Sequence, residues 1–198
     1  MDKPLKIAVV GETFAASRTV QRAQTLAQMG HLVTAIPTTP PGWSYETPPG
    51  LMRRIGHRLR LPGDPAGANR AILVAVESGI DVVWIEAAKM IRAGTLRRAR
   101  EINPAVRILW YCEDDMINPA HRSRWLDKAI PLFDLWVTTK SFNANPDEMP
   151  SRGATKILFV DNSFDPHLHR PVTVDRGQRG QFGAAISFIG TFEEPRAD

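Results

Sequence analysis

The sequence predicts an α/β domain built on a doubly wound, mostly parallel sheet. Apolar runs of strand length recur along the chain, and amphipathic segments of helical period separate them. The runs are almost continuously hydrophobic rather than alternating, which is typical of strands covered on both faces of a parallel sheet. The regular alternation of strand and helix favours a Rossmann-like arrangement, although it does not specify the order of the strands.

The predicted strands lie at residues 6–10, 32–36, 82–85, 107–111, 135–138 and 156–160. Helices are predicted between them at residues 16–29, 68–78, 95–102 and 123–130, where apolar side chains recur every three or four positions. Gly30 and Gly79 follow two of these segments. We expect both to end a helix, because glycine adopts the left-handed conformation there without steric cost.

Two segments interrupt the alternation. Residues 37–50 contain five prolines together with Trp43 and Tyr45, and they predict a loop that leaves the sheet and is mobile or faces an acceptor. Residues 165–182 become rich in glycine, glutamine and arginine and predict irregular structure, after which the apolar residues 185–189 begin another strand. We therefore expect a domain over residues 1–180 and, over residues 181–198, a junction with the first strand of a truncated second domain.

The composition is that of an ordinary globular protein and excludes several functional classes. The 198 residues are 43% hydrophobic and 23% charged, and a net charge of +4 does not by itself indicate a nucleic-acid-binding protein. The single cysteine, Cys112, excludes an intrachain disulfide and is expected to be a small buried side chain near a strand end. No segment suits a signal sequence or a membrane span, so we expect a cytoplasmic protein. His167 and His169 lack a third ligand, and we expect no metal and no cofactor.

The loop after the first predicted strand is a candidate substrate-binding segment. Gly11, Glu12 and Thr13 stand where the strand should meet a helix, and ligands of open α/β sheets bind at such carboxyl ends. The dinucleotide-binding glycine pattern is absent, since Thr13 and Ala16 occupy two of its glycine positions. The alternative is a tight turn in which Gly11 permits an unusual backbone angle.

Carboxylates follow two other predicted strands. Glu113, Asp114 and Asp115 are consecutive, and adjacent carboxylates at a strand end suit a general base or a cation ligand. They would otherwise form an acidic cap for a helix near Pro119, or a solvated turn. Glu86 follows residues 82–85 and is a candidate substrate ligand, or else a surface residue that caps the next helix.

Residues 51–60 predict a basic amphipathic helix. Leu51, Ile55 and Leu59 share one face, and Arg53 and Arg54 belong to the basic residues that fill the rest. Such a helix can lie on an anionic membrane or hold a phosphorylated acceptor; the alternative is a solvated charged face packed on the domain. Residues 97–100 predict an exposed basic helix face.

Several short segments in the second half of the chain carry a family resemblance. They are 110–115 (WYCEDD), 134–139 (DLWVTT), 159–166 (FVDNSFDP), 169–172 (HRPV), 186–192 (ISFIGTF) and 195–197 (PRA). They resemble the late N-terminal strands and the interdomain junction of the spore-maturation (CgeB-type) glycosyltransferases, which have the GT-B fold of two Rossmann-like domains. The first half of the chain matches in architecture only.

The resemblance implies the acceptor-side half of a glycosyltransferase, which transfers a sugar from a nucleotide-sugar donor to an unknown acceptor. Gly190 and Thr191 would face the donor diphosphate, and the rest of the donor site would belong to a missing C-terminal domain. An inverting enzyme would use Asp114 or Asp115 as its base, whereas a retaining enzyme would need no base. The isolated 198 residues are then expected to be inactive.

Two other classes of function remain open. A stand-alone Rossmann-like module would bind a small ligand or a partner protein without catalysis. A receiver-type phosphoacceptor domain would require an acidic pair after the first strand, where Gly11-Glu12-Thr13 supplies one acid.

Overall fold

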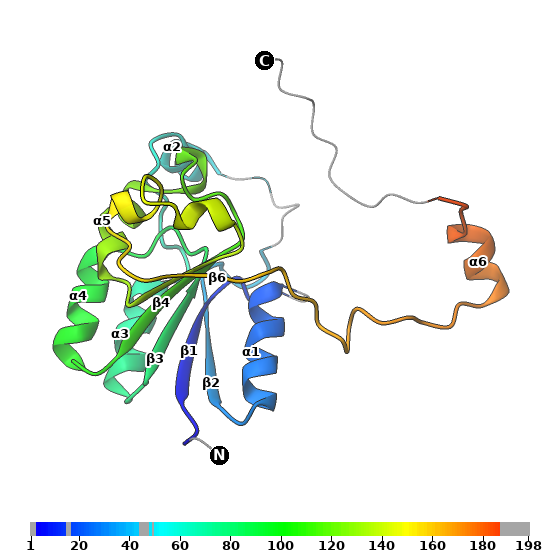
Figure 1. Cartoon of the computed structure of the whole chain (residues 1–198), viewed down its shortest axis with the longest axis horizontal. Helices are drawn as coiled ribbons and strands as arrows, with labels where there is room; N and C mark the ends of the chain where they lie inside the picture. Colours follow the sequence, from blue (N-terminus) through cyan, green and yellow to red (C-terminus); the bar gives the residue numbers. More distant parts are fainter. Residues whose placement is uncertain (1–2, 15–16, 44–47, 49, 187–198) are drawn as a thin grey trace. The chain divides into compact units, whose positions relative to one another are not determined.

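One six-stranded sheet organises the computed structural model (Figure 1), which describes residues 3–14, 17–43, 48 and 50–186. The strands are β1 (Lys6–Gly11), β2 (Leu32–Pro37), β3 (Val82–Glu86), β4 (Arg107–Cys112), β5 (Leu135–Thr138) and β6 (Ile157–Phe159). Their order is β2-β1-β3-β4-β5-β6, and every neighbouring pair is parallel. The six predicted strands and the doubly wound α/β class are thereby confirmed.

Helices connect the strands. They are α1 (Arg18–Gln28), α2 (Leu51–Arg58), α3 (Ala68–Glu77), α4 (Ala93–Ile102) and α5 (Arg124–Ala129). Serine hydroxyls begin two of them: Ser17 Oγ accepts from the Val20 amide at 3.3 Å, and Ser123 Oγ accepts from the Leu126 amide at 2.9 Å. Gly30 and Gly79 follow α1 and α3 with φ of +92° and +85°, so their predicted role as helix ends is confirmed.

The two faces of the sheet are covered unequally. On one face, strand side chains such as Ile85, Ile108 and Trp110 form a fully buried core with α3, α4 and α5. The Trp110 and Trp136 rings stack there with centroids 5.3 Å apart. The opposite face carries α1 (Figure 1), and Trp84, in register with Val9 of β1, is only partly buried there.

The role of Gly11 at the end of β1 differs from the one expected. The unusual backbone angle proposed for it is wrong, because Gly11 is the last residue of β1 and its φ is not positive. A Cβ at this position would lie 2.4 Å from Thr19 Oγ1 of α1. Glycine is therefore needed for the close approach of α1 to β1, not for a turn.

The chain divides into two compact units, Met1–Ser163 and Phe164–Asp198. The second unit contains α6 (Arg176–Phe182), so the irregular structure predicted for residues 165–182 is wrong over its last part. Asp175 Oδ1 accepts from the Gln178 amide at 2.8 Å, and Gln178 Oε1 accepts from the Asp175 amide at 2.9 Å. This capping box stabilises a glycine-containing helix that composition alone disfavours. The predicted strand at 185–189 falls largely on residues outside those described, as do Gly190 and Thr191.

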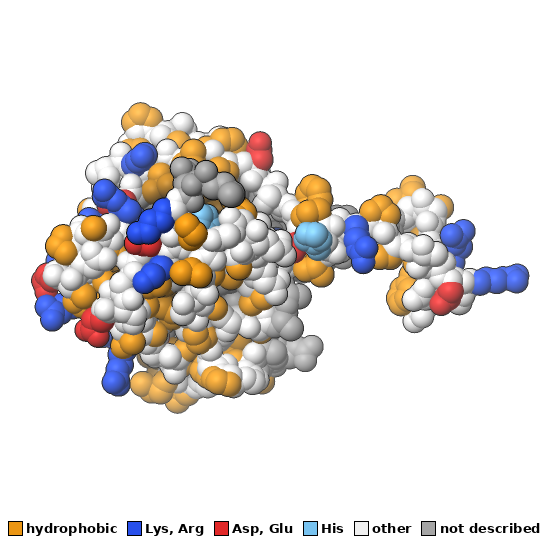
Figure 2. Space-filling model, turned by 90° about the horizontal axis from the view of Figure 1, so that it is seen from below, with side chains coloured by type: hydrophobic (Ala, Val, Ile, Leu, Met, Phe, Trp, Pro, Cys, Tyr) orange, Lys and Arg blue, Asp and Glu red, His pale blue; other side chains and the backbone are white. Residues whose placement is uncertain are grey.

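Charged side chains at the N-terminal ends of the strands form no patch of one sign. Seen from below, Lys and Arg side chains are interspersed with Asp and Glu (Figure 2). Arg98 pairs with Glu101 at 2.9 Å, and Arg100 pairs with Asp134 at 3.1 Å. Arg97 and Arg98 are exposed as predicted, whereas Ala99 is buried in the core. Within the described residues, no helix is long and apolar enough to cross a membrane.

Candidate functional site

A large cleft of the described chain lies at the C-terminal ends of the strands. The sheet order places β1 between β2 and β3. The connection after β1 leads to β2 on one side and the connection after β3 leads to β4 on the other, so a crevice opens between the ends of β1 and β3. The cleft has a volume of about 1410 Å³. The strand ends and α1 supply one side, which we call the strand-end wall, and residues 52–65 of α2 and the following loop supply the other, the α2 wall. Ligands of doubly wound sheets bind at this position.

Glu86 forms the buried floor of the strand-end wall. It ends β3 and is 8% exposed. Its Oε2 accepts from Thr19 Oγ1 at 2.8 Å and from Arg22 Nη1 at 3.0 Å, while its Oε1 is buried without a partner in the described residues. The alternative interpretation of Glu86 as a surface helix cap is wrong, because α4 begins later, after Arg92. The carboxylate instead joins β3 to α1.

Glu113 extends this network across β4. Arg22 Nη2 donates to Glu113 Oε1 at 2.5 Å, and Arg18 pairs with the other oxygen of Glu113. The Arg22 guanidinium also lies 4.0 Å above the centroid of the Tyr111 ring. Arg22 therefore bridges the ends of β3 and β4, and two carboxylates share its charge.

Asp114 and Asp115 have different surroundings. Asp114 is exposed and lines the cleft. Asp115 does not line it; its Oδ1 accepts from the Ile117 amide at 3.0 Å and from Asn143 Nδ2 at 3.1 Å. The acidic helix cap proposed for these residues is wrong, because Asn118 caps the short 3₁₀ helix at Pro119–His121. Asp114 is thus the carboxylate of the pair that faces the cleft, with the Cys112 thiol 3.7 Å from its Oδ2, and Asp115 holds the loop.

Cys112, beneath Asp114, is buried at the end of β4, as predicted. Burial raises the pKa of its thiol to about 12, and the negative charge of Asp114 adds to the increase. The thiol is therefore neutral at physiological pH and is no nucleophile.

The loop after β1 and helix α2 place the remaining predicted site residues. Glu12 lines the cleft, whereas Gly11 is buried and Thr13 lines a neighbouring cavity of about 230 Å³ with Trp43. On the α2 wall, Arg53 lines the cleft and its guanidinium lies 4.5 Å from the Trp43 ring centroid. Arg54 is exposed and does not line the cleft.

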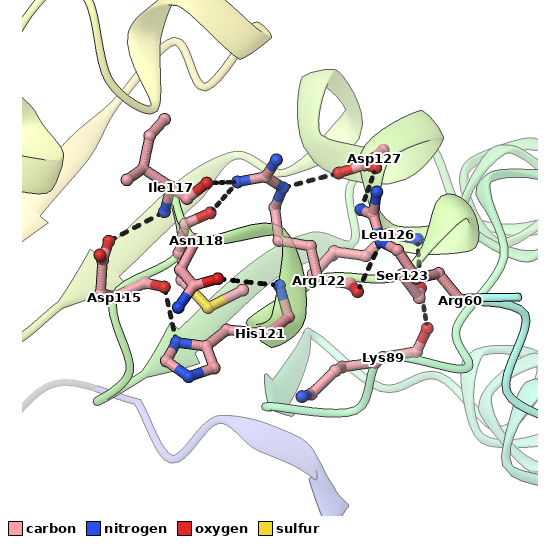
Figure 3. Close-up of polar contacts among 12 residues, drawn as sticks. Arg60, Lys89, Asp115, Ile117, Asn118, His121, Arg122, Ser123, Leu126 and Asp127 are labelled. Carbon is pink, nitrogen blue, oxygen red and sulfur yellow. Dashed lines mark hydrogen bonds and ion pairs between the residues drawn. The ribbon is translucent and has the colours of Figure 1, made fainter. Parts of the chain in front are cut away.

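A buried arginine that sequence reasoning missed anchors the α2 wall. Arg122 is 4% exposed, and its Nη1 donates to the Met116 and Ile117 carbonyls (Figure 3). Its Nε donates to Asp127 Oδ1 at 2.8 Å, and Asp127 Oδ2 accepts from Arg60 Nη2 at 2.8 Å. Ser123 Oγ donates to the Lys89 carbonyl at 2.5 Å. These contacts fasten the end of α2 and the loop after β3 to α5. No local pattern distinguishes Arg122 from the exposed arginines around it.

Comparison of the chain with protein-family models and with curated protein sequences finds no match. The site is therefore interpreted from its own geometry. Among the described residues, no group of three His, Cys, Asp or Glu side chains could hold a metal ion. The cleft presents the exposed Asp114 carboxylate above a floor of paired charges, and this arrangement suits recognition of a polar, hydroxyl-bearing ligand.

Proposed function

We propose that this chain is the acceptor-side domain of a glycosyltransferase of the GT-B type. The observation that carries the proposal is the cleft at the reversal of strand order, with the exposed Asp114 carboxylate on its strand-end wall. The doubly wound parallel sheet supports it, since each domain of that fold is built on such a sheet. The segments around residues 110–115 and 159–172 resemble those of the spore-maturation glycosyltransferases.

In the proposed reaction, Asp114 accepts the proton of the acceptor hydroxyl as that oxygen attacks the anomeric carbon. The bond from the anomeric carbon to the donor diphosphate breaks, and the diphosphate leaves with the electron pair. Asp114 suits the role because it is exposed in the cleft, whereas Glu86 and Glu113 already hold Arg22. Asp115 positions the loop through Asn143. The nucleotide sugar would be held mainly by a second domain that includes Gly190 and Thr191.

Calorimetry with UDP-, GDP- and dTDP-sugars tests whether donor binding belongs to a second domain and not to this chain. The proposal expects the 198 residues to bind no nucleotide sugar more tightly than about 1 mM. Micromolar binding would place the donor site inside this chain and would favour a stand-alone ligand-binding module instead.

Turnover tests the role of Asp114 in a protein that joins this chain to a donor-binding domain. Asp114→Asn should lower kcat by about 10²-fold or more and leave donor KM nearly unchanged, because the base acts only in the transition state. Asp147→Asn is the matched control, since Asp147 is exposed and does not line the cleft. Equal kcat in the two variants would remove Asp114 from the mechanism and leave a retaining reaction or a binding role.

A further inference from the structure

Helix α2 has an unusual environment for a helix of a doubly wound domain: none of its residues is buried. Leu51, Met52 and Ile55 are 70%, 78% and 43% exposed, and the following Leu59 is 49% exposed. The helix lies at the end of the molecule where the strands terminate (Figure 1). An amphipathic helix that leaves its apolar side chains in water is a candidate interaction surface.

The charges on this helix are of one sign. Residues 50–63 contain four arginines and one histidine and no acidic residue. Arg54 and Arg58 have no ion pair within the described residues, whereas Arg18, Arg22, Arg98, Arg100 and Arg122 are all paired with carboxylates. Arg60 at the end of the segment is also paired, through Asp127. Within the described residues, no carboxylate thus pairs with Arg54 or Arg58 of α2.

The combination of exposed apolar and cationic side chains on α2 favours some classes of binding partner over others. A nucleic acid or an acidic protein loop would engage the arginines and gain little from Leu51 and Met52. An anionic lipid surface engages both, because phosphate headgroups attract the guanidinium groups while the apolar side chains enter the acyl boundary.

We propose that α2 and the adjoining Leu59 form a docking surface for an anionic lipid membrane. Arg54 and Arg58 contact lipid phosphates, and Leu51 and Met52 insert beneath them. Leu51, Arg54 and Arg58 do not line the cleft, whereas Met52, Ile55 and Leu59 do, so this surface adjoins the proposed acceptor site and shares part of α2 with it. The proposal stands whether or not the cleft is catalytic.

Vesicle co-sedimentation of the 198-residue chain tests the surface. Vesicles of phosphatidylcholine with roughly 30% phosphatidylglycerol are compared with pure phosphatidylcholine at about 0.1 M salt. We expect binding to the anionic vesicles only. Arg54→Glu with Arg58→Glu should weaken binding at least about tenfold, and Leu51→Ser with Met52→Ser should weaken it by a similar factor.

The matched control is Arg97→Glu with Arg98→Glu on α4, an equal charge reversal on exposed side chains, which should leave binding near the wild-type level. All variants should keep the wild-type Tm, because none of the altered side chains is buried. Wild-type chain that fails to bind anionic vesicles, or an equal loss in the α4 control, would overturn the proposal. Loss on arginine reversal without loss on Leu51 and Met52 replacement would indicate a soluble polyanion and would also overturn it.

Discussion

The strand-end wall of the cleft and helix α2 hold their arginines in opposite ways. On the strand-end wall, Arg22 is clamped between Glu86 and Glu113 and lies over the Tyr111 ring. On helix α2, Arg54 and its apolar neighbours Leu51 and Met52 are exposed, and Arg54 and Leu51 lie outside the cleft lining. A guanidinium that shares its charge with a buried and a half-buried carboxylate organises the fold, whereas one without a carboxylate partner can contact a separate binding partner.

The largest difference should appear when one arginine is removed from the strand-end wall and another from helix α2. Arg22→Met should lower the free energy of unfolding by about 3 kcal/mol, because it leaves the buried Glu86 carboxylate without its counter-charge. Arg54→Met should change it by less than about 0.5 kcal/mol. Urea unfolding followed by circular dichroism measures both. Adding Glu86→Gln to Arg22→Met should recover part of the loss; equal losses for the two single variants would contradict the comparison.

Glycine substitutions probe how tightly each wall is packed. Gly11→Ala should cost about 2 kcal/mol, since the new Cβ would lie 2.4 Å from Thr19 Oγ1. Gly63→Ala, in the loop that follows α2, meets no atom within 4 Å and should cost less than about 0.5 kcal/mol. Thermal unfolding of the two variants gives the comparison. If Gly11→Ala kept the wild-type Tm, the close contact between β1 and α1 would not hold in solution.

A smaller effect should come from Cys112 at alkaline pH. Its thiol has a pKa raised by burial from 9.0 to about 12, so the unfolded chain releases a proton between these values while the folded chain retains it. Stability is therefore full below pH 9 and falls as the pH rises above it, by about 1.4 kcal/mol for each pH unit. Between pH 8 and pH 10, wild type should lose about 1.4 kcal/mol more than Cys112→Ala in urea unfolding. Identical losses would show that the thiol titrates normally.

The sequence by itself determined the elements of this protein. The limits of all six strands lie within one residue of those predicted, and Gly30 and Gly79 end their helices, because apolar period and glycine conformation are local properties. The basic amphipathic character of α2 was also predictable from the ten residues 51–60. Helix α6 had a local signal as well, the capping box of Asp175 and Gln178, which the glycine-rich composition obscured.

Only the tertiary structure decided which residues meet at the cleft. Arg22 and Glu86 are 64 residues apart and come together because the strand order sets β1 beside β3. The same topology selects Asp114 over Asp115 as the carboxylate that faces the cleft, and it makes Gly11 a contact point for Thr19. Arg122 is buried where it pairs with Asp127 of α5 and donates to the Met116 and Ile117 carbonyls, and its local sequence does not predict these contacts. Strand order and burial depend on contacts between distant segments, and no local pattern contains them.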